Sequence, residues 1–402
     1  MTATFRVARI ITRLNIGGPS IQAIDLSREL SERGFETCLI HGRVSPGEGD
    51  MTTMLPLGNT ATVYVNDLIR PVSLLRDLRA WWQIYRALGR WRPEIVHTHM
   101  AKAGALGRLA ALAYNRTSGA RRPARLLHTY HGHVFEGYFG ARSTRVFLTV
   151  ERWLGRRTDV VIAISPQVRH DLLHTYGIAR DDQLRLVPLG FNLDRFAALS
   201  SADRERARAD LRIPEGAAVI TTVGRLTGIK QHSLFLEMAA RVAAWSDNVL
   251  FLIVGDGELR RDLEAQAEHL NIASRVRFLG WRSDLETIYA ATDVFVLTSR
   301  NEGTPVALIE AMASGVATVS TDVGGVRDVM TGPALGALVP FDDSKGLADA
   351  VIRFAQAANL RAQTGHAARL AVLERFHLRR LIGDITSLYR ELLDRPSPGS
   401  AS

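Results

Sequence analysis

The stretch VFVLTSRNEGTPVALIEAMASGVATVST, residues 294–321, contains the unit on which the fold is built. An apolar run at 294–298 predicts a buried strand, and a second apolar run at 318–321 predicts another. Between them, Gly303, Thr304 and Pro305 open a stretch of helical composition, and proline is favoured in the first turn of a helix. Strand, helix and strand in this order indicate a parallel sheet whose strands are joined by a helical crossover.

The same alternation runs through the rest of the chain and predicts an α/β fold of two doubly wound parallel sheets. We expect domains at 1–192 and 193–376, a helix at 377–394 and a disordered tail at 395–402. Such sheets bind ligands at the carboxyl ends of their strands, so a ligand cleft is expected between the domains. The further strands are expected at 6–12, 36–41, 95–99, 125–129, 160–165, 218–223, 249–254, 276–279 and 337–339.

The composition excludes several classes of protein. Hydrophobic residues make up 46% of the 402 and charged residues 23%, which are the proportions of a folded globular protein. The single cysteine, Cys38, excludes a disulfide-stapled scaffold. No apolar run approaches the roughly 18 residues that a membrane span needs. Arginines interrupt the apolar N-terminus, which indicates a first strand instead of a signal peptide, so we expect a cytoplasmic protein.

The positive charge is concentrated in the first half of the chain. Residues 1–190 hold 26 Lys+Arg and 15 Asp+Glu, a net charge of +11, whereas residues 191–402 hold 24 and 26, a net charge of −2. This asymmetry favours an anionic partner for the first half, such as a phosphorylated substrate, an anionic membrane face or a nucleic acid.

The most basic segment, residues 70–92, holds six arginines and one aspartate. Because it also carries Trp81, Trp82, Tyr85 and Trp91, it resembles a helix that lies on an anionic membrane surface. The alternative is an ordinary surface helix whose aromatic side chains pack on the sheet. A second basic cluster, which adds to the case for membrane contact, consists of Arg121, Arg122, Arg125, Arg142 and Arg145.

Two strand ends carry residues suited to phosphate. Gly17 and Gly18 follow the first strand and precede a helix expected to start near Ser20, and free amides at a helix N-terminus attract phosphate. Arg225 and Lys230 follow the first strand of the second half, where two cations suit a diphosphate. A tight turn and a solvated charge pair are the structural alternatives.

Two further motifs have weaker signals. In VGDGEL, Asp256 is expected to lie in a turn and to cap a helix that begins near Glu258. The alternative is that Asp256 contacts a ligand directly. The histidines His128, His131 and His133 follow a strand, but their spacing is not that of a metal site on a helix, and the chain has no D-x-D pair. We therefore expect no metal.

Glu302 and Glu310 are the strongest candidates for ligand binding. Glu302 lies in the loop before a predicted helix and Glu310 lies within that helix, a little over two turns further on. Ionised carboxylates are pure acceptors and suit sugar hydroxyls. Glu310 stands among apolar residues, where a charge without a partner is costly. The alternative is that both are ordinary helix acids.

In their order along the chain, these motifs resemble the family-four retaining glycosyltransferases, which have the GT-B architecture. The resemblance covers nearly the whole chain and includes a paired-glutamate signature at Glu302 and Glu310. It is carried by IGGP (16–19), IVHTH (95–99), TYHGH (129–133), VVIAIS (160–165), VPLGFN (187–192), VGRL (223–226), VGDGEL (254–259), VRFLGW (276–281) and NEGTPVALIEAMASG (301–315).

The resemblance implies a nucleotide-sugar donor held mainly by the second domain. Gly17 and Gly18 would contact the donor diphosphate, and Arg225 and Lys230 would neutralise it as it leaves. His131 falls where the family has a histidine beside the donor sugar.

The paired-glutamate segment would bind the rest of the donor. Glu302 would hold hydroxyls of the sugar and Glu310 the ribose. The backbone amides of Gly303, Thr304 and Val306 would contact phosphate or sugar. The C-terminal helix would cross back onto the first, acceptor-side domain.

The implied activity is that of a retaining, metal-independent hexosyltransferase without a cofactor. We expect a UDP-sugar donor and a lipid-linked or other membrane-proximal glycan acceptor, in polysaccharide biosynthesis at the inner face of the cell membrane. Two alternatives stay open: a nucleotide-sugar 2-epimerase of the same architecture, which the paired glutamates disfavour, and a basic nucleic-acid-binding protein. No recognition-helix or single-strand motif accompanies the positive charge, so nucleic acid is not expected as a partner.

Overall fold

The computed structural model describes residues 4–45, 48–119, 123–132 and 141–395, with residues 141–144 described by their backbone alone. His133, Arg121, Arg122, the side chain of Arg142 and the tail from residue 396 lie outside the described residues. The chain divides into two compact units, Met1–Phe191 with Leu378–Ser402 and Asn192–His377. Each is built on one parallel sheet, which confirms the expected pair of Rossmann-like folds.

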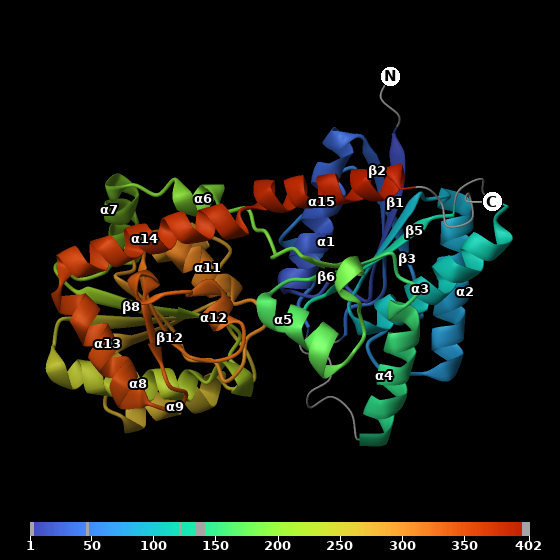
Figure 1. The fold of residues 1–402 in the computed structure, drawn as a ribbon. Helices are drawn as coiled ribbons and strands as arrows, with labels where there is room; N and C mark the ends of the chain where they lie inside the picture. The colour runs from blue at the N-terminus through green and yellow to red at the C-terminus, as the bar shows by residue number, and fades with distance from the viewer. Residues whose placement is uncertain (1–3, 46–47, 120–122, 133–140, 396–402) are drawn as a thin grey trace. The chain divides into compact units, whose positions relative to one another are not determined.

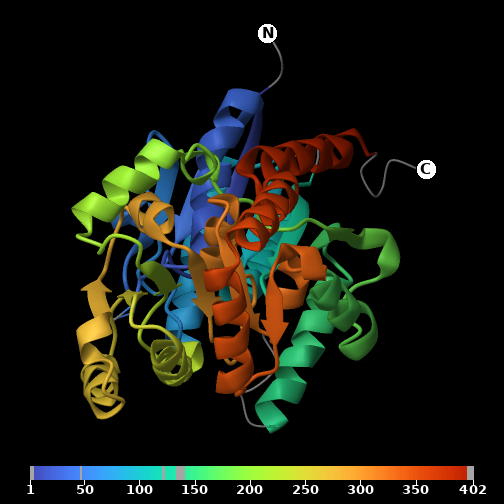
Figure 2. The ribbon, with the colours of Figure 1, turned by 90° about the vertical axis from the view of Figure 1, so that its left-hand side faces the viewer.

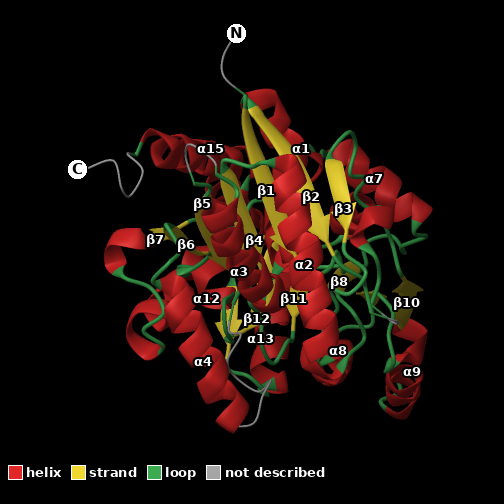
Figure 3. Ribbon diagram, turned by 90° about the vertical axis from the view of Figure 1, so that its right-hand side faces the viewer, coloured by secondary structure: helices red, strands yellow, loops and turns green. Residues whose placement is uncertain are grey.

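The sheet of the first unit has the strand order β3-β2-β1-β4-β5-β6-β7 (Figure 3). Its central strands are buried on both faces, as expected for apolar strands covered by helices on either side. The edge strand β3 was not among the predicted strands, because its four residues are only half-buried and carry no long apolar run. The strands are β1 (Phe5–Ile11), β2 (Phe35–His41), β3 (Ala61–Tyr64), β4 (Ile95–His99), β5 (Arg125–Tyr130), β6 (Val160–Ala163) and β7 (Leu184–Leu186).

Helices cover both faces of this sheet (Figures 1 and 3). One core cluster joins α2 and α3 to the strands, and a second cluster, on the opposite face, joins α1 and α15 to them. The C-terminal helix α15 therefore belongs to the first unit, as predicted. The helices are α1 (Gly18–Glu29), α2 (Leu74–Trp91), α3 (Ala101–Thr117), α4 (Ala141–Gly155), α5 (Pro166–His170) and α15 (Leu378–Asp394).

The sheet of the second unit has the order β10-β9-β8-β11-β12-β13. Figures 1 and 2 show the ribbon of this unit, with β8 and β12 labelled in Figure 1. Its strands are β8 (Ala218–Val223), β9 (Val249–Val254), β10 (Val276–Gly280), β11 (Val294–Leu297), β12 (Ala317–Thr321) and β13 (Ala337–Val339). Its helices are α6 (Asp194–Ala197), α7 (Ser201–Asp210), α8 (His232–Trp245), α9 (Arg260–His269), α10 (Leu285–Ala291), α11 (Val306–Ala313), α12 (Val326–Val329), α13 (Ser344–Gln356) and α14 (Ala358–Phe376).

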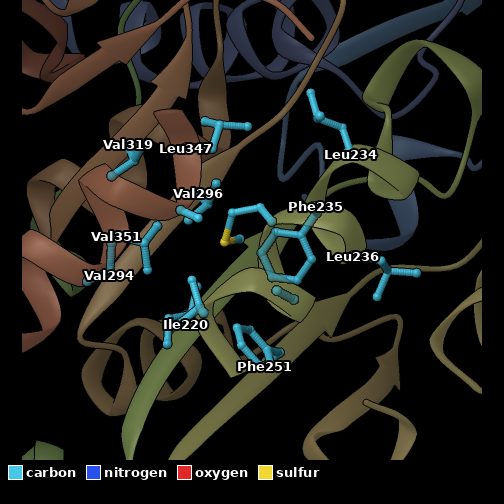
Figure 4. Close-up of a cluster of buried hydrophobic side chains, with 14 of the residues drawn as sticks. Ile220, Leu234, Phe235, Leu236, Phe251, Val294, Val296, Val319, Leu347 and Val351 are labelled. Atoms are coloured by element: carbon cyan, nitrogen blue, oxygen red, sulfur yellow. The ribbon is translucent and has the colours of Figure 1, made fainter. Parts of the chain in front are cut away.

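The largest core of the second unit lies between its sheet and helices α8 and α13 (Figure 4). Phe235 of α8 packs edge-on against Phe251 of β9, with ring centroids 6.2 Å apart. Val294 and Val296 of β11 and Val351 of α13 complete this layer. Burial of these apolar side chains fixes the strands, and with them the positions of the loops at their carboxyl ends.

Candidate active site

The loops after β8 and β9 approach each other so closely that only glycine fits between them. A Cβ on Gly255, whose φ is +130°, would lie 2.0 Å from the carbonyl oxygen of Gly224. A Cβ on Gly257 would lie 2.5 Å from the carbonyl oxygen of Leu226. The glycines of VGDG therefore serve this close backbone contact.

Asp256, between these glycines, was predicted to cap a helix, and it does not. Helix α9 begins at Arg260, its N-cap is Leu259, and no side chain caps it. The Asp256 carboxylate instead accepts a hydrogen bond from the Gly257 amide at 2.8 Å and forms an ion pair with Arg260 at 3.0 Å. The expectation of a cap failed because this local pairing satisfies the carboxylate before the helix starts.

The loop after β8 positions Arg225 and Lys230. Arg225 is exposed, and its side chain forms no hydrogen bond or ion pair within the described part of the chain, although its carbonyl oxygen accepts from the Thr227 amide at 2.8 Å. Lys230 extends to Glu302, and its Nζ donates to Glu302 Oε1 at 2.6 Å. The backbone of Lys230 is held by the hydroxyl of Thr298, which donates to its carbonyl oxygen at 3.1 Å. The structure thus joins two of the predicted site residues directly.

Glu302 is nearly buried, with 9% of its surface exposed. Its Oε1 also accepts a hydrogen bond from Ser299 Oγ at 2.6 Å. Ser299 was not predicted, although its place directly after a buried strand was the available signal. Because Lys230, which is partly exposed, and Ser299 both donate to Oε1, the Glu302 carboxylate is fixed in one orientation.

The backbone beside Glu302 is supported by a glycine pair that sequence reasoning missed. Gly325 donates its amide to the carbonyl oxygen of Glu302 at 2.8 Å. A Cβ on Gly324 would lie 2.3 Å from that oxygen, and one on Gly325 only 1.7 Å from the carbonyl oxygen of Gly303. The loop after β12 therefore presses against the chain at 302–303.

Gly303, Thr304 and Val306 lie at the start of α11, as predicted. The helix begins at Val306 with Pro305 as its N-cap, so the proline stands one position before the first turn in which it was expected. The Pro305 carbonyl accepts the first helical hydrogen bond, from the Ile309 amide at 3.1 Å. Gly303 is exposed and Thr304 partly exposed, and amides at a helix start suit phosphate or other anions.

Glu310 lies within α11, five residues into the helix, and has a different environment from Glu302. Tyr289 OH donates to Glu310 Oε2 at 3.4 Å and also reaches the carbonyl oxygen of Ala307 at 3.1 Å. Burial raises the pKa of Glu310 to about 7, although the charge of Arg195 opposes the rise. Burial and the nearby Glu310 also raise the pKa of Tyr289 well above its ordinary value. Neither Tyr289 nor Arg195 was predicted, because both are distant from the glutamates in sequence.

In the first unit, Gly17 is the N-cap of α1, which begins at Gly18, two residues earlier than predicted. The Gly17 carbonyl accepts from the amides of Ser20 and Ile21 at 3.1 and 3.2 Å, and Pro19 has no amide to offer. Of the first-turn amides that the structure describes, only that of Gly18 is without a recorded partner.

His131 follows β5 in the same unit. Its Nε2 lies 3.0 Å from His99 Nδ1, and burial lowers the pKa of His131 to about 3. His131 is therefore neutral at physiological pH. The structure brings it together with His97 and His99 of β4, which the sequence did not connect to it.

The expectation that the protein binds no metal stays a prediction. In the part of the chain that the structure describes, no three histidine, cysteine or acidic side chains come together as a metal site would require. None of the described helices combines the length and apolar character needed to cross a membrane.

Comparison with known proteins identifies the family. Residues 16–195 match the family described as Glycosyltransferase Family 4, and residues 203–371 match the one described as Glycosyl transferases group 1. The UDP-Gal:alpha-D-GlcNAc-diphosphoundecaprenol alpha-1,3-galactosyltransferase of Escherichia coli is 29% identical over 336 residues, which cover 82% of this chain and 84% of that protein. The lipopolysaccharide core biosynthesis glycosyltransferase LpsD of Rhizobium meliloti is 27% identical over 384 residues, 94% of this chain and 95% of that one.

Solved structures agree on the fold. Anabaena HepE in complex with UDP superposes with a TM-score of 0.80 at 20% identity, covering 96% of this chain and 100% of that chain. The sucrose-phosphate synthase of Thermosynechococcus elongatus superposes with a TM-score of 0.78 at 24% identity, covering 97% and 99%. With two parallel-sheet units, an ordered set of motifs and family matches in both halves, the chain belongs to the family 4 glycosyltransferases, transferase enzymes of GT-B architecture.

Proposed function

We propose that this enzyme is a retaining, metal-independent glycosyltransferase that moves a hexose from a UDP-sugar to a lipid-linked glycan acceptor at the surface of a membrane. The observation that carries the proposal is the Lys230–Glu302 pair, held at 2.6 Å beside the start of α11.

The pair offers both kinds of contact that a sugar diphosphate needs. Within the described residues, both hydrogen bonds to the Glu302 carboxylate end on Oε1, which leaves Oε2 to accept from a sugar hydroxyl. Lys230 retains 28% of its side-chain surface and has two further N–H donors for phosphate oxygen. Arg225, exposed on the same loop, adds a second cation.

These cations supply the electrostatic stabilisation in the proposed reaction. The bond between the anomeric carbon and the diphosphate breaks, and negative charge develops on the leaving oxygen. Lys230, Arg225 and the amides of Gly303 and Thr304 stabilise that charge, with no metal ion required. The acceptor hydroxyl attacks the same face of the sugar, and its proton passes to the departing diphosphate.

Relatives support the choice of donor and acceptor. The name of the Escherichia coli relative gives UDP-Gal as its donor and a diphosphoundecaprenol-linked GlcNAc as its acceptor. Anabaena HepE was solved with UDP. For this chain, Glu310 is the residue proposed to bind the ribose of UDP.

The surface of the first unit supports the membrane part of the proposal. Helix α2 exposes Leu74 (87%) and Leu78 (63%) on its first two turns, between exposed arginines that include Arg76 and Arg79. The alternative for this segment was a surface helix whose aromatic side chains pack on the sheet. Trp81, Tyr85 and Trp91 do pack on the core, whereas Trp82 is half-exposed. Apolar side chains among arginines suit the interface of an anionic membrane.

Helix α4 has the same character. It exposes Val146 and Trp153, and the exposed arginines beside them include Arg145 and Arg152. Exposed clusters of large apolar side chains are uncommon on proteins that contact only water.

A donor screen tests the catalytic proposal. The thermal stability of the purified enzyme is measured with UDP-, GDP- and ADP-sugars, and repeated with Lys230→Ala and Glu310→Ala. A ligand at about 100 times its Kd stabilises by about 2.7 kcal/mol, or several degrees in Tm. We expect a shift with UDP-sugars that both variants reduce and that Lys345→Ala, a control on an exposed lysine of α13, retains.

Product analysis separates transfer from epimerisation. Incubation with the donor alone yields a converted nucleotide sugar only if the enzyme is a 2-epimerase. No shift with any nucleotide sugar, or conversion of the donor without acceptor, would overturn the proposed reaction.

Sedimentation with vesicles that contain anionic lipid tests the membrane contact. Because full burial of a leucine is worth about 1.5–3 kcal/mol, the double variant Leu74→Glu/Leu78→Glu should bind at least about tenfold more weakly. Leu370→Glu, which changes an exposed leucine of α14, is the matched control and should bind as the wild type does. Equal binding by all three proteins would refute the proposed surface.

A further inference from the structure

A continuous series of hydrogen bonds connects the centre of the first sheet to His131. Arg9 of β1 lies beside His97 of β4, and His99 lies beside Thr129 of β5. Since side chains alternate along a strand, Arg9, His97 and His99 all project from the face that α1 and α15 cover. Arg9, His97 and His99 are completely buried.

The Arg9 guanidinium has four neutral partners. Its Nε donates to Ser27 Oγ at 3.2 Å, and its Nη2 donates to Tyr389 OH at 3.2 Å. Its Nη1 lies 3.1 Å from both His97 Nδ1 and His99 Nε2. No carboxylate among the described residues forms an ion pair with Arg9. A full positive charge is therefore buried against imidazoles and hydroxyls.

This contact determines where the hydrogens of the next two histidines lie. A guanidinium has only donors, so His99 Nε2 accepts and the single hydrogen of neutral His99 is on Nδ1. That Nδ1 lies 3.0 Å from His131 Nε2 and donates to it. His131 Nε2 therefore accepts, and the hydrogen of His131 is on Nδ1.

The donor that results is unsatisfied. His131 Nδ1 is shielded from solvent and has no hydrogen-bond partner among the described residues. Buried donors are nearly always paired, because leaving one unpaired is costly. The buried charge of Arg9 also polarises the series and strengthens the terminal N–H as a donor.

We propose that Arg9 and His99 are positioning residues, which hold His131 in the tautomer whose Nδ1–H donates a hydrogen bond to an acceptor oxygen of the bound nucleotide sugar. In this tautomer, Nε2 is occupied by His99, so His131 acts as a hydrogen-bond donor and not as a general base. The identity of the ligand rests on the proposed function, whereas the tautomer does not.

Nitrogen NMR on protein labelled with 15N in its histidine rings tests the tautomer without any substrate. The His131 signals are identified by their loss in His131→Asn. We expect the wild type to show a protonated Nδ1 and an unprotonated Nε2 at His131, and His99→Leu to show a mixture of tautomers. A protonated Nε2 in the wild type would overturn the proposal, whatever reaction the enzyme performs.

Kinetics test the consequence for transfer. In His99→Asn the amide nitrogen stands close to the place of Nδ1 and retains a donor for His131, whereas His99→Leu has none. We expect His99→Leu to lower kcat about 10- to 100-fold with little change in KM for the nucleotide sugar. His99→Asn should stay within about threefold of the wild type. Equal losses in both variants would refute the positioning role.

Two controls complete the design. His170→Asn, on the exposed side of α5, should leave both the NMR signals of His131 and the kinetics unchanged. The Tm of each variant shows whether it folds, and Arg9→Met replaces His99→Leu if the latter does not. If no nucleotide sugar reacts with the wild type, the proposed function fails while the NMR result still decides the tautomer.

Discussion

Among the residues that the structure describes, each face of the first sheet buries one arginine completely, and the two arginines have opposite environments. On the face covered by α2 and α3, Arg108 Nη2 donates to both oxygens of Glu151, at 2.8 and 2.7 Å, and Tyr130 donates to the same carboxylate. On the other face, the hydrogen-bond partners of the Arg9 side chain in the described part of the chain are all neutral.

The difference separates a structural charge from one that acts on its neighbours. The charge of Arg108 is largely cancelled by Glu151, and the pair links α3 to α4. The charge of Arg9 is not cancelled. Burial, with this charge as a further cause, lowers the pKa of His97 and of His99 well below the ordinary value. Removing one partner of a buried ion pair is strongly destabilising, because the other charge is left without compensation. An unpaired buried charge acts instead on the neutral groups that surround it.

The largest effect is expected from breaking the paired arginine. Glu151→Gln leaves Arg108 buried without a counter-ion, which costs about 3–5 kcal/mol of the free energy of unfolding. Urea unfolding followed by a signal of the first unit measures the loss. Glu29→Gln, which removes one partner of the half-exposed Arg28–Glu29 pair, should cost less than about 1 kcal/mol. Equal effects of the two changes would contradict the comparison.

Lys230 represents a third situation, a cation that is paired but still partly exposed. Under the proposed function, Lys230→Ala should lower kcat about 100- to 1,000-fold, because it would remove a preorganised donor for the leaving diphosphate. Its Tm without ligand should change little, because the lysine is partly exposed. Steady-state kinetics beside Lys345→Ala check this, and a loss of Tm in proportion to the loss of kcat would indicate a structural role.

Glu310 resembles Arg9 in that an ionisable side chain has a neutral hydrogen-bond partner, here the hydroxyl of Tyr289. Its pKa is about 7 in the folded enzyme and 4.5 ordinarily, so the folded state retains a proton that the unfolded chain releases. The contribution of this proton to the free energy of unfolding is complete below pH 4.5, falls as the pH rises to 7, and is lost above pH 7.

Glu310→Gln should remove this dependence. A difference of about 2.5 pKa units corresponds to about 3 kcal/mol, so the variant should be more stable than the wild type at pH 8 and similar at pH 5. Tm measured across this range provides the test. A wild-type advantage at pH 8 would mean that the carboxylate has an ionic partner when folded.

The smallest change is expected from removing the unpaired arginine. In Arg9→Met the lost hydrogen bonds are offset by relief from burying an uncompensated charge, so the free energy of unfolding should stay within about 1 kcal/mol of the wild type. Arg108→Met should cost distinctly more, because it leaves Glu151 buried without its cation. Similar losses of unfolding free energy in Arg9→Met and Arg108→Met would contradict the proposed difference between the two arginines.

The parts of the fold that local sequence determines were predictable. The strands β8, β9 and β11 are apolar runs buried on both faces, and their loops carry the glycines and charges that the motifs suggested. The positions of Lys230 and Glu302 after two such strands led to the expectation of a shared site, and they are in direct contact.

Contacts between distant segments were not predictable from residue patterns. Tyr389 bonds to His97 across 292 positions of sequence, and nothing in IVHTH indicates this partner. Tyr289 likewise reaches Glu310 from another helix. Nor did residue patterns indicate that Arg9 lies beside the histidines of IVHTH, although strand alternation places His97 and His99 on one face with it.

The return of α15 to the first unit has a consequence for biosynthesis. The ribosome completes residues 1–191 well before it makes Leu381, Ile385 and Tyr389, which cover one face of β1, β4 and β5. At about 5–20 residues per second, the intervening segment takes on the order of 10–40 s to synthesise. Throughout that interval, the apolar face lacks its covering helix and Arg9 lacks Tyr389. The nascent chain is thus most exposed to aggregation and chaperone binding while its second unit is being translated.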